Sequence, residues 1–140
     1  MSRPCFQVGL AVALAVVALA GCARQSAIVT TATGLRYQVL VAGEGDPARP
    51  GQRVTIHETV TLRNGTPVFD SREKNTPITI QLGVNQVIAG LDEGVTGMRI
   101  GERRIFTIPP ALSHRSSYPP NTPPDSTLVI DLEVLDILDP

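Results

Sequence analysis

The chain of 140 residues has no tryptophan, two cysteines, two histidines and only 4% aromatic residues. Both cysteines, Cys5 and Cys22, lie near the N-terminus. The rest of the chain therefore offers no thiol for a disulfide, a nucleophile or a zinc site. The folded part must be stable through packing alone.

An excess of one charge is also missing, since 12 lysines and arginines accompany 13 aspartates and glutamates, for a net charge of −1. No cluster of basic residues stands out, so we expect no nucleic-acid partner. The clean apolar stretch, Val8 to Ala20, holds 13 residues, whereas a membrane-spanning helix needs about 20. The length suits one domain with a modest core.

The N-terminal segment has the order of a secretory signal peptide. Arg3 precedes the apolar stretch, and small residues follow it, as is typical before a cleavage site. Leu19-Ala20-Gly21-Cys22 resembles a bacterial lipobox, whose cysteine is acylated and becomes the new N-terminus. The resemblance implies a lipoprotein signal peptide over residues 1–21 and a lipid anchor on Cys22. Ala23 follows, with no aspartate to suggest inner-membrane retention, so we expect an outer-membrane protein facing the periplasm.

Residues 22–32 are small and polar, which predicts a lipid-anchored tether before a folded domain over residues 33–140. Arg53 to Leu62 alternates between apolar and polar residues, which predicts a half-buried strand. Asn64-Gly65 predicts a hairpin turn after it, since both residues tolerate positive φ. Further strands are predicted at residues 35–41, from 68 onward, and at 78–82, 102–108 and 127–138.

Apolar residues from Val87 to Val95 recur at helical spacing, which predicts one short helix over residues 87–94. Residues 109–124 contain six prolines and predict a long, stiff loop. Strands dominate, and hairpin links outnumber crossovers. The predicted fold class is therefore α+β, with an antiparallel sheet of about five strands wrapped around one short α-helix.

Four segments resemble, in order, motifs of the FKBP-type peptidyl-prolyl cis-trans isomerases. They are GTPVFDS at residues 65–71, QVIAGLDEGV at 86–95, MRIGERR at 98–104 and PPDSTLVIDLEV at 123–134. The match covers nearly all of Thr33 to Asp139. It implies an FKBP-like fold, in which a bent antiparallel sheet surrounds one short helix. It also implies isomerisation of X-Pro peptide bonds without a cofactor or metal.

Catalysis of that reaction requires a particular kind of pocket. The barrier of about 18–20 kcal/mol arises because amide resonance must be broken. The twisted amide is less polar than the planar one, so an apolar pocket favours it, and hydrogen bonds to it can add to this. We therefore expect an apolar hollow with a few polar groups and no nucleophile.

The resemblance assigns the catalytic pocket to Phe69, Asp70, Val87, Ile88 and Leu91. Phe69 and Asp70 match the family's pocket phenylalanine and aspartate, and Val87 and Ile88 match its pair at the helix start. The Ile88 N–H is implied to donate to a substrate carbonyl. The alternative for these apolar residues is plain core packing.

Other pocket positions depart from the family pattern. Leu91 replaces the tryptophan of the pocket floor, and Glu58 replaces the tyrosine of the second strand. Ile130 replaces a phenylalanine of the last strand. His114 replaces a tyrosine of the long loop, and Ile78 replaces a third phenylalanine. The implied pocket stays apolar but loses most of its flat rings.

Glu58 is unusual because it lies on the apolar face of its strand. One hypothesis pairs it with Asp70, where two close carboxylates would share a proton; another neutralises them with Arg72 or Arg103. The alternative, which we favour from the sequence, places Glu58 in water at the sheet rim.

Three functions fit these features. The first is a lipid-anchored isomerase that assists the folding of proline-containing exported polypeptides. The second is a catalytically weak binding or chaperone module of the same fold, and the third is a structural envelope lipoprotein. The long N-terminal helical extension of dimeric relatives is missing, so we expect a monomer.

Overall fold

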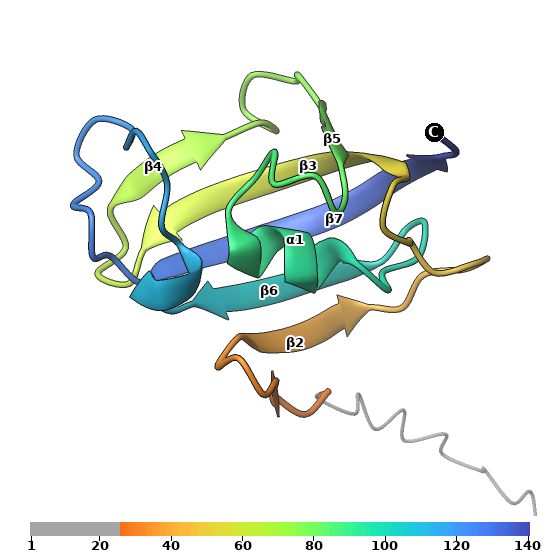
Figure 1. Ribbon diagram of the computed structural model, residues 1–140, viewed down its shortest axis with the longest axis horizontal. Helices are drawn as coiled ribbons and strands as arrows, with labels where there is room; N and C mark the ends of the chain where they lie inside the picture. Colours follow the sequence, from red (N-terminus) through yellow and green to blue (C-terminus); the bar gives the residue numbers. More distant parts are fainter. Residues whose placement is uncertain (1–25) are drawn as a thin grey trace, which may run out of the picture.

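The computed structural model describes residues 26–140, and the predicted signal peptide and Cys22 lie outside them. The described strands form one antiparallel sheet that bends around a single short helix, α1 (Ala89–Val95), as Figure 1 shows. The sheet order is β1-β2-β6-β7-β3-β4, and β5 also pairs with β3. The strands are β1 (Val29–Thr30), β2 (Arg36–Val41), β3 (Arg53–Leu62), β4 (Pro67–Asp70), β5 (Ile78–Gln81), β6 (Arg103–Ile108) and β7 (Leu128–Leu138).

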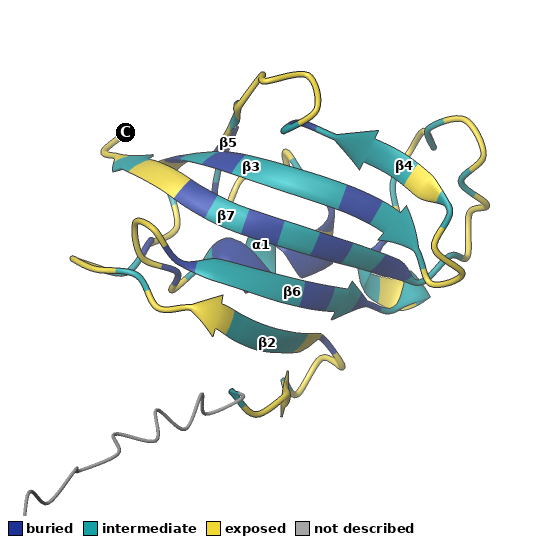
Figure 2. Cartoon of the chain, turned by 180° about the vertical axis from the view of Figure 1, so that it is seen from behind, coloured by how far each residue is buried: buried dark blue, intermediate teal, exposed yellow. Residues whose placement is uncertain are grey.

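The two longest strands, β3 and β7, pair from Arg53↔Leu138 to Leu62↔Leu128 and form the middle of the sheet. Apolar and polar residues alternate along both, so every second side chain faces α1. Figure 2 shows this alternation as buried and partly buried bands along β7. The buried residues of these strands are Val54, Ile56, Val60, Leu128, Ile130, Leu132 and Val134.

Helix α1 lies close against β6 because two of its buried residues are glycines. A Cβ atom on Gly94 would lie 2.6 Å from Cε1 of Phe106, and one on Gly90 would lie 2.5 Å from Cγ2 of Ile108. Both partners are fully buried. The apolar residues Leu91 and Val95 occupy the rest of the buried face. The side chain of Leu91 therefore packs between the helix and the sheet.

The sheet has seven strands where about five were expected, and α1 covers residues 89–95 rather than 87–94. Three local differences also stand out. Val29–Thr30 of the expected tether pairs with β2 and so belongs to the sheet. Residues 110–112 of the expected loop form a 3-10 turn, η1 (Pro110–Leu112). In the β3–β4 hairpin, Gly65 takes a φ of +89°, whereas Oδ1 of Asn64 accepts the N–H of Thr66 at 3.0 Å. Asn64 thus contributes a side-chain acceptor to the turn.

Across residues 26–140, no helix has both the length and the apolar character needed to cross a membrane.

Candidate functional site

A hollow of about 360 Å³ lies between α1, the central strands and the loop that follows η1. We call it the α1 hollow. It brings together six of the nine residues proposed from the sequence, namely Glu58, Val87, Ile88, Leu91, His114 and Ile130, and it is completed by Val60, Asn85, Gln86, Arg115 and Ser116. A second hollow, of about 370 Å³, lies over β2, β6 and β7 and contains none of the nine.

One wall of the α1 hollow is formed by the start of the helix. The Ile88 carbonyl accepts the N–H groups of Leu91 at 3.0 Å and Asp92 at 3.1 Å, which begins α1 at the next residue. The backbone of Ile88 is extended, with φ −58° and ψ 148°. Its own N–H is not taken up by another backbone carbonyl within the described residues. A donor is therefore available beside the apolar side chains of Val87, Ile88 and Leu91.

Glu58 lies in the middle of the sheet rather than at its rim. β7 pairs with one edge of β3. On the other edge, both β4 and β5 pair with β3. The Glu58 N–H donates to Oγ of Ser71 at 2.8 Å, and the Ser71 N–H donates to the Glu58 carbonyl at 3.0 Å. The expectation that Glu58 sits in water at the rim is therefore wrong, because β3 is an inner strand and the Oε2 atom of Glu58 is shielded from solvent.

The Glu58 carboxyl is held in an apolar setting. Its Oε2 atom is buried and has no hydrogen-bond partner among the described residues. Burial raises the pKa of Glu58 to about 6, and the positive charge of Arg115 works in the opposite direction. Burial disfavours the ionised form because the low-dielectric interior solvates charge poorly.

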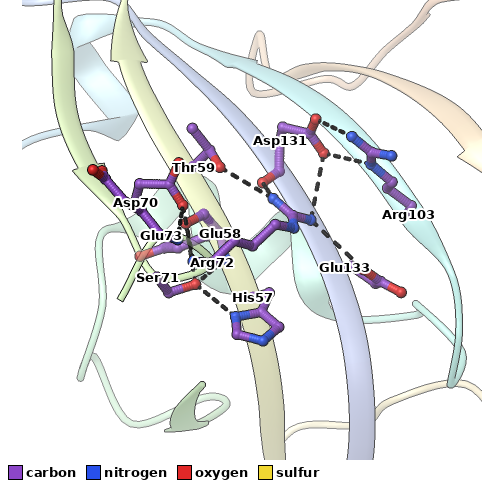
Figure 3. A network of polar contacts seen from close by, with 10 residues as sticks. All are labelled: His57, Glu58, Thr59, Asp70, Ser71, Arg72, Glu73, Arg103, Asp131 and Glu133. Carbon is purple, nitrogen blue, oxygen red and sulfur yellow. Dashed lines mark hydrogen bonds and ion pairs between the residues drawn. The ribbon is translucent and has the colours of Figure 1, made fainter. Parts of the chain in front are cut away.

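Asp70 lies in a different environment. Its Oδ1 accepts the backbone N–H groups of Glu73 at 3.1 Å and Arg72 at 2.8 Å. These donors, with smaller effects from Thr59 and the Arg72 guanidinium, hold the pKa of Asp70 below its ordinary value. Asp70 pairs with Thr59, whose hydroxyl belongs to the polar network of Figure 3. Thr59 lies between Glu58 and Val60, which line the α1 hollow, so it faces the other side of the sheet, its outer face. The hypothesis of a proton shared with Glu58 is therefore wrong, because the two carboxyl groups lie on opposite faces of the sheet and neither is among the causes of the other's pKa shift.

The two arginines proposed to neutralise Glu58 bind elsewhere. Arg103 forms two hydrogen bonds to the Asp131 carboxylate, of 2.8 and 2.6 Å. These bonds raise the pKa of Arg103. Arg72 reaches across β3, as Figure 3 shows, to Thr59 at 3.1 Å and to the Asp131 carboxylate at 3.8 Å. This network occupies the outer face, so neither arginine neutralises Glu58. For Asp70, the other carboxyl of the hypothesis, the charge of Arg72 does help to lower the pKa.

A family model described as FKBP-type peptidyl-prolyl cis-trans isomerase matches residues 45–135. The chain belongs to this family. The "Peptidyl-prolyl cis-trans isomerase" of Schizosaccharomyces pombe is 41% identical over 76% of this chain and 96% of its own length. The "FK506-binding protein 4" of Dictyostelium discoideum is 40% identical over 79% of this chain, but this chain spans only 30% of it.

Solved FKBP-type structures confirm the fold. FkpA from Escherichia coli superimposes with a TM-score of 0.74 and 33% identity, over 84% of this chain and 54% of that one. AtFKBP13 superimposes with a TM-score of 0.69 and 28% identity, over 79% of this chain and 98% of that one. The predicted FKBP-like architecture, an antiparallel sheet with a single short helix, is therefore correct.

Three of the FKBP-type site residues expected from the sequence do not line the α1 hollow. Phe69 pairs with Val60 and Ile78 pairs with Ile56, so both pack against the core beside the hollow. Asp70 faces the outer side, because the next residue along a strand points to the opposite face. The roles predicted for these three residues stay predictions, since the lining of the α1 hollow does not include them.

The loop after η1 contributes a residue that sequence reasoning missed. Arg115 lines the α1 hollow beside His114. The Tyr118 hydroxyl lies 3.3 Å from Nδ1 of His114 and so links two parts of the loop. Nothing local in the sequence marks Arg115, since its effect on Glu58 depends on how the loop folds over the sheet. Asn85 and Gln86 could have been found, because they directly precede the Val87-Ile88 motif.

No group of three or more potential metal-ligating His, Cys, Asp or Glu residues occurs in the described part of the chain. Six of the eleven residues that line the α1 hollow are polar or charged, so the expected apolar hollow is only partly realised. Its apolar part is formed by Val60, Val87, Ile88, Leu91 and Ile130, beside the Ile88 N–H and the Glu58 carboxyl. These are groups that can bind and orient a peptide.

Proposed function

We propose that this FKBP-type protein is an active peptidyl-prolyl cis-trans isomerase that assists the folding of exported, proline-containing polypeptides at the cell envelope. The observation that carries the proposal is the α1 hollow itself, in which the family's Val-Ile pair and the helix residue Leu91 meet Ile130 of the last strand. Family membership supports the reaction type.

The α1 hollow would act by favouring the twisted amide. The side chains of Val87, Leu91 and Ile130 replace water around the proline ring, and an apolar environment favours the less polar, twisted state. The Ile88 N–H would position the substrate by donating to a peptide carbonyl. A modest acceleration needs no more than this, because each 1.36 kcal/mol removed from the barrier raises the rate about tenfold.

The lipid anchor and the periplasmic location rest on the N-terminal pattern. Residues 19–22 resemble a lipobox, and Ala23 carries no inner-membrane retention signal. The sheet begins at Val29, so an acylated Cys22 would hold the folded domain close to the membrane. Mass spectrometry of the membrane-extracted protein should find acyl chains on Cys22, and Cys22→Ala should leave the protein without them.

The isomerase proposal is tested by measuring cis-to-trans exchange of short Leu-Pro and Phe-Pro peptides. The protein should accelerate exchange, and Leu91→Ala should reduce the acceleration because it removes part of the hollow. Leu40→Ala is the matched control, since it makes the same truncation at an exposed leucine that does not line the hollow. A well-folded protein that fails to accelerate either peptide would refute the proposal for such substrates.

A specific observation favours a second function, a catalytically weak binding or chaperone module. The positions of four family aromatic residues are occupied by Glu58, Leu91, His114 and Ile130, all of which line the α1 hollow. Such a hollow can hold a peptide while giving little selective stabilisation to the twisted amide. Peptide binding without accelerated exchange would identify this function.

A further inference from the structure

One group in the α1 hollow is chemically unlike its surroundings. The Glu58 Oε2 atom is buried and has no hydrogen-bond partner within residues 26–140. The neighbouring walls are the apolar side chains of Val60, Leu91 and Ile130. An unpaired, buried carboxylate oxygen is costly. Oε2 itself is closed off from solvent, but the Glu58 side chain lines a space that a ligand can enter. A ligand in the hollow can therefore approach the Glu58 carboxyl group.

The charges that face Glu58 come from the loop after η1. Arg115 and the neighbouring His114 both line the α1 hollow. Arg115 favours the ionised form of Glu58, but no ion pair within 4.0 Å joins the two among the described residues. From β4, Asp70 directs its carboxylate to backbone N–H groups instead. From β7 and α1, the facing residues are the apolar Ile130 and Leu91.

Elementary chemistry identifies the partner that fits. An ionised carboxylate only accepts hydrogen bonds, so the ligand must bring a donor. Proline has no N–H, so the donor belongs to a residue beside it. Charge-assisted hydrogen bonds are roughly twice as strong as neutral ones. The best donors among peptide side chains are therefore lysine and arginine.

Building on the proposed function, we propose that Glu58 determines peptide specificity by accepting a hydrogen bond from a lysine or arginine side chain next to the proline that occupies the α1 hollow. Peptides with an acidic residue at the same place are excluded by repulsion. The selected class is thus basic-proline and proline-basic segments.

The test measures dissociation constants of the full chain for capped peptides that differ only beside the proline. Ala-Lys-Pro-Ala and Ala-Pro-Lys-Ala are compared with their leucine and glutamate counterparts by NMR titration at pH 7.5. We expect the better lysine peptide to bind about tenfold more tightly than its leucine counterpart, as one charge-assisted hydrogen bond can provide. The glutamate peptide should bind most weakly.

Variants of Glu58 and a series of pH values test whether Glu58 causes the preference for lysine peptides. Glu58→Gln should abolish the lysine preference, read as the ratio of leucine-peptide to lysine-peptide dissociation constants, and Glu58→Asp should retain part of it. Glu44→Gln, a loss of the same charge at an exposed residue, should change nothing. In the native chain the preference should fade as the pH falls below about 6, where Glu58 becomes protonated.

The outcomes separate this inference from the proposed activity. Equal binding of lysine and leucine peptides, a lysine preference that survives in Glu58→Gln, or no peptide binding at all would overturn the inference. Isomerisation of a Leu-Pro peptide is measured in parallel. A lysine preference without isomerisation would overturn the enzyme proposal alone, and isomerisation without the preference would overturn the inference alone.

Discussion

The buried carboxyl of Glu58 should make this protein less stable at neutral pH than at mildly acidic pH, relative to a variant without the charge. The pKa of Glu58 is raised from 4.5 to about 6 in the folded state. The folded state thus binds the Glu58 proton more tightly than the unfolded state. The resulting penalty is absent below about pH 4.5, appears as the pH rises, and is complete above about pH 6.

The size of this penalty follows from the shift. A difference of about 1.5 pKa units at about 1.36 kcal/mol each gives roughly 2 kcal/mol. Glu58→Gln removes the charge and keeps the shape. We compare the free energy of unfolding of Glu58→Gln with that of the native chain. The difference, variant minus native, should be about 2 kcal/mol larger at pH 7.5 than at pH 4.

Urea unfolding at a series of pH values measures this difference. Circular dichroism is the suitable signal, because the chain has no tryptophan. His57 and His114 are present in both proteins, so their contributions cancel in the comparison. Glu44→Gln should show no such pH dependence. A stability difference that is constant with pH, or that grows on acidification, would refute the burial argument.

Four further outcomes are expected. Arg115→Ala should raise the pKa of Glu58, measured by NMR titration, because it removes the one cation that favours its ionised form. Gly94→Ala should cost about 1–2 kcal/mol in urea unfolding, since the added Cβ would overpack the buried Phe106 ring despite a better helix propensity; Phe106→Leu in the same chain should recover part of this loss. Asp131→Ala should lower stability by about 1 kcal/mol, less at high salt, because two arginines lose a shared partner. The pKa of Asp70 is lower in the folded state than its unfolded value of about 4. Ionised Asp70 therefore contributes stability above about pH 4, and this contribution is lost as the pH falls through the folded-state pKa. Acid unfolding of Asp70→Asn should lack that component.

The sequence by itself determined the local elements and the family. The alternation from Arg53 to Leu62 predicted β3 with the bounds that the structure shows, because a strand exposes every second residue to the same environment. Helical spacing located α1 to within two residues at its start. The family motifs placed Val87, Ile88 and Leu91 together, and the α1 hollow confirms their proximity.

The tertiary structure alone decided which side chains share an environment. The Oε2 atom of Glu58 is buried because its side chain faces the α1 hollow from a central strand, and Asp70 faces the other side of the sheet through its pairing with Thr59. Arg115, rather than Arg72 or Arg103, influences Glu58 because the loop after η1 folds over the α1 hollow. Burial and charge act through space, so their effects depend on strand order and loop placement, which local sequence patterns do not encode.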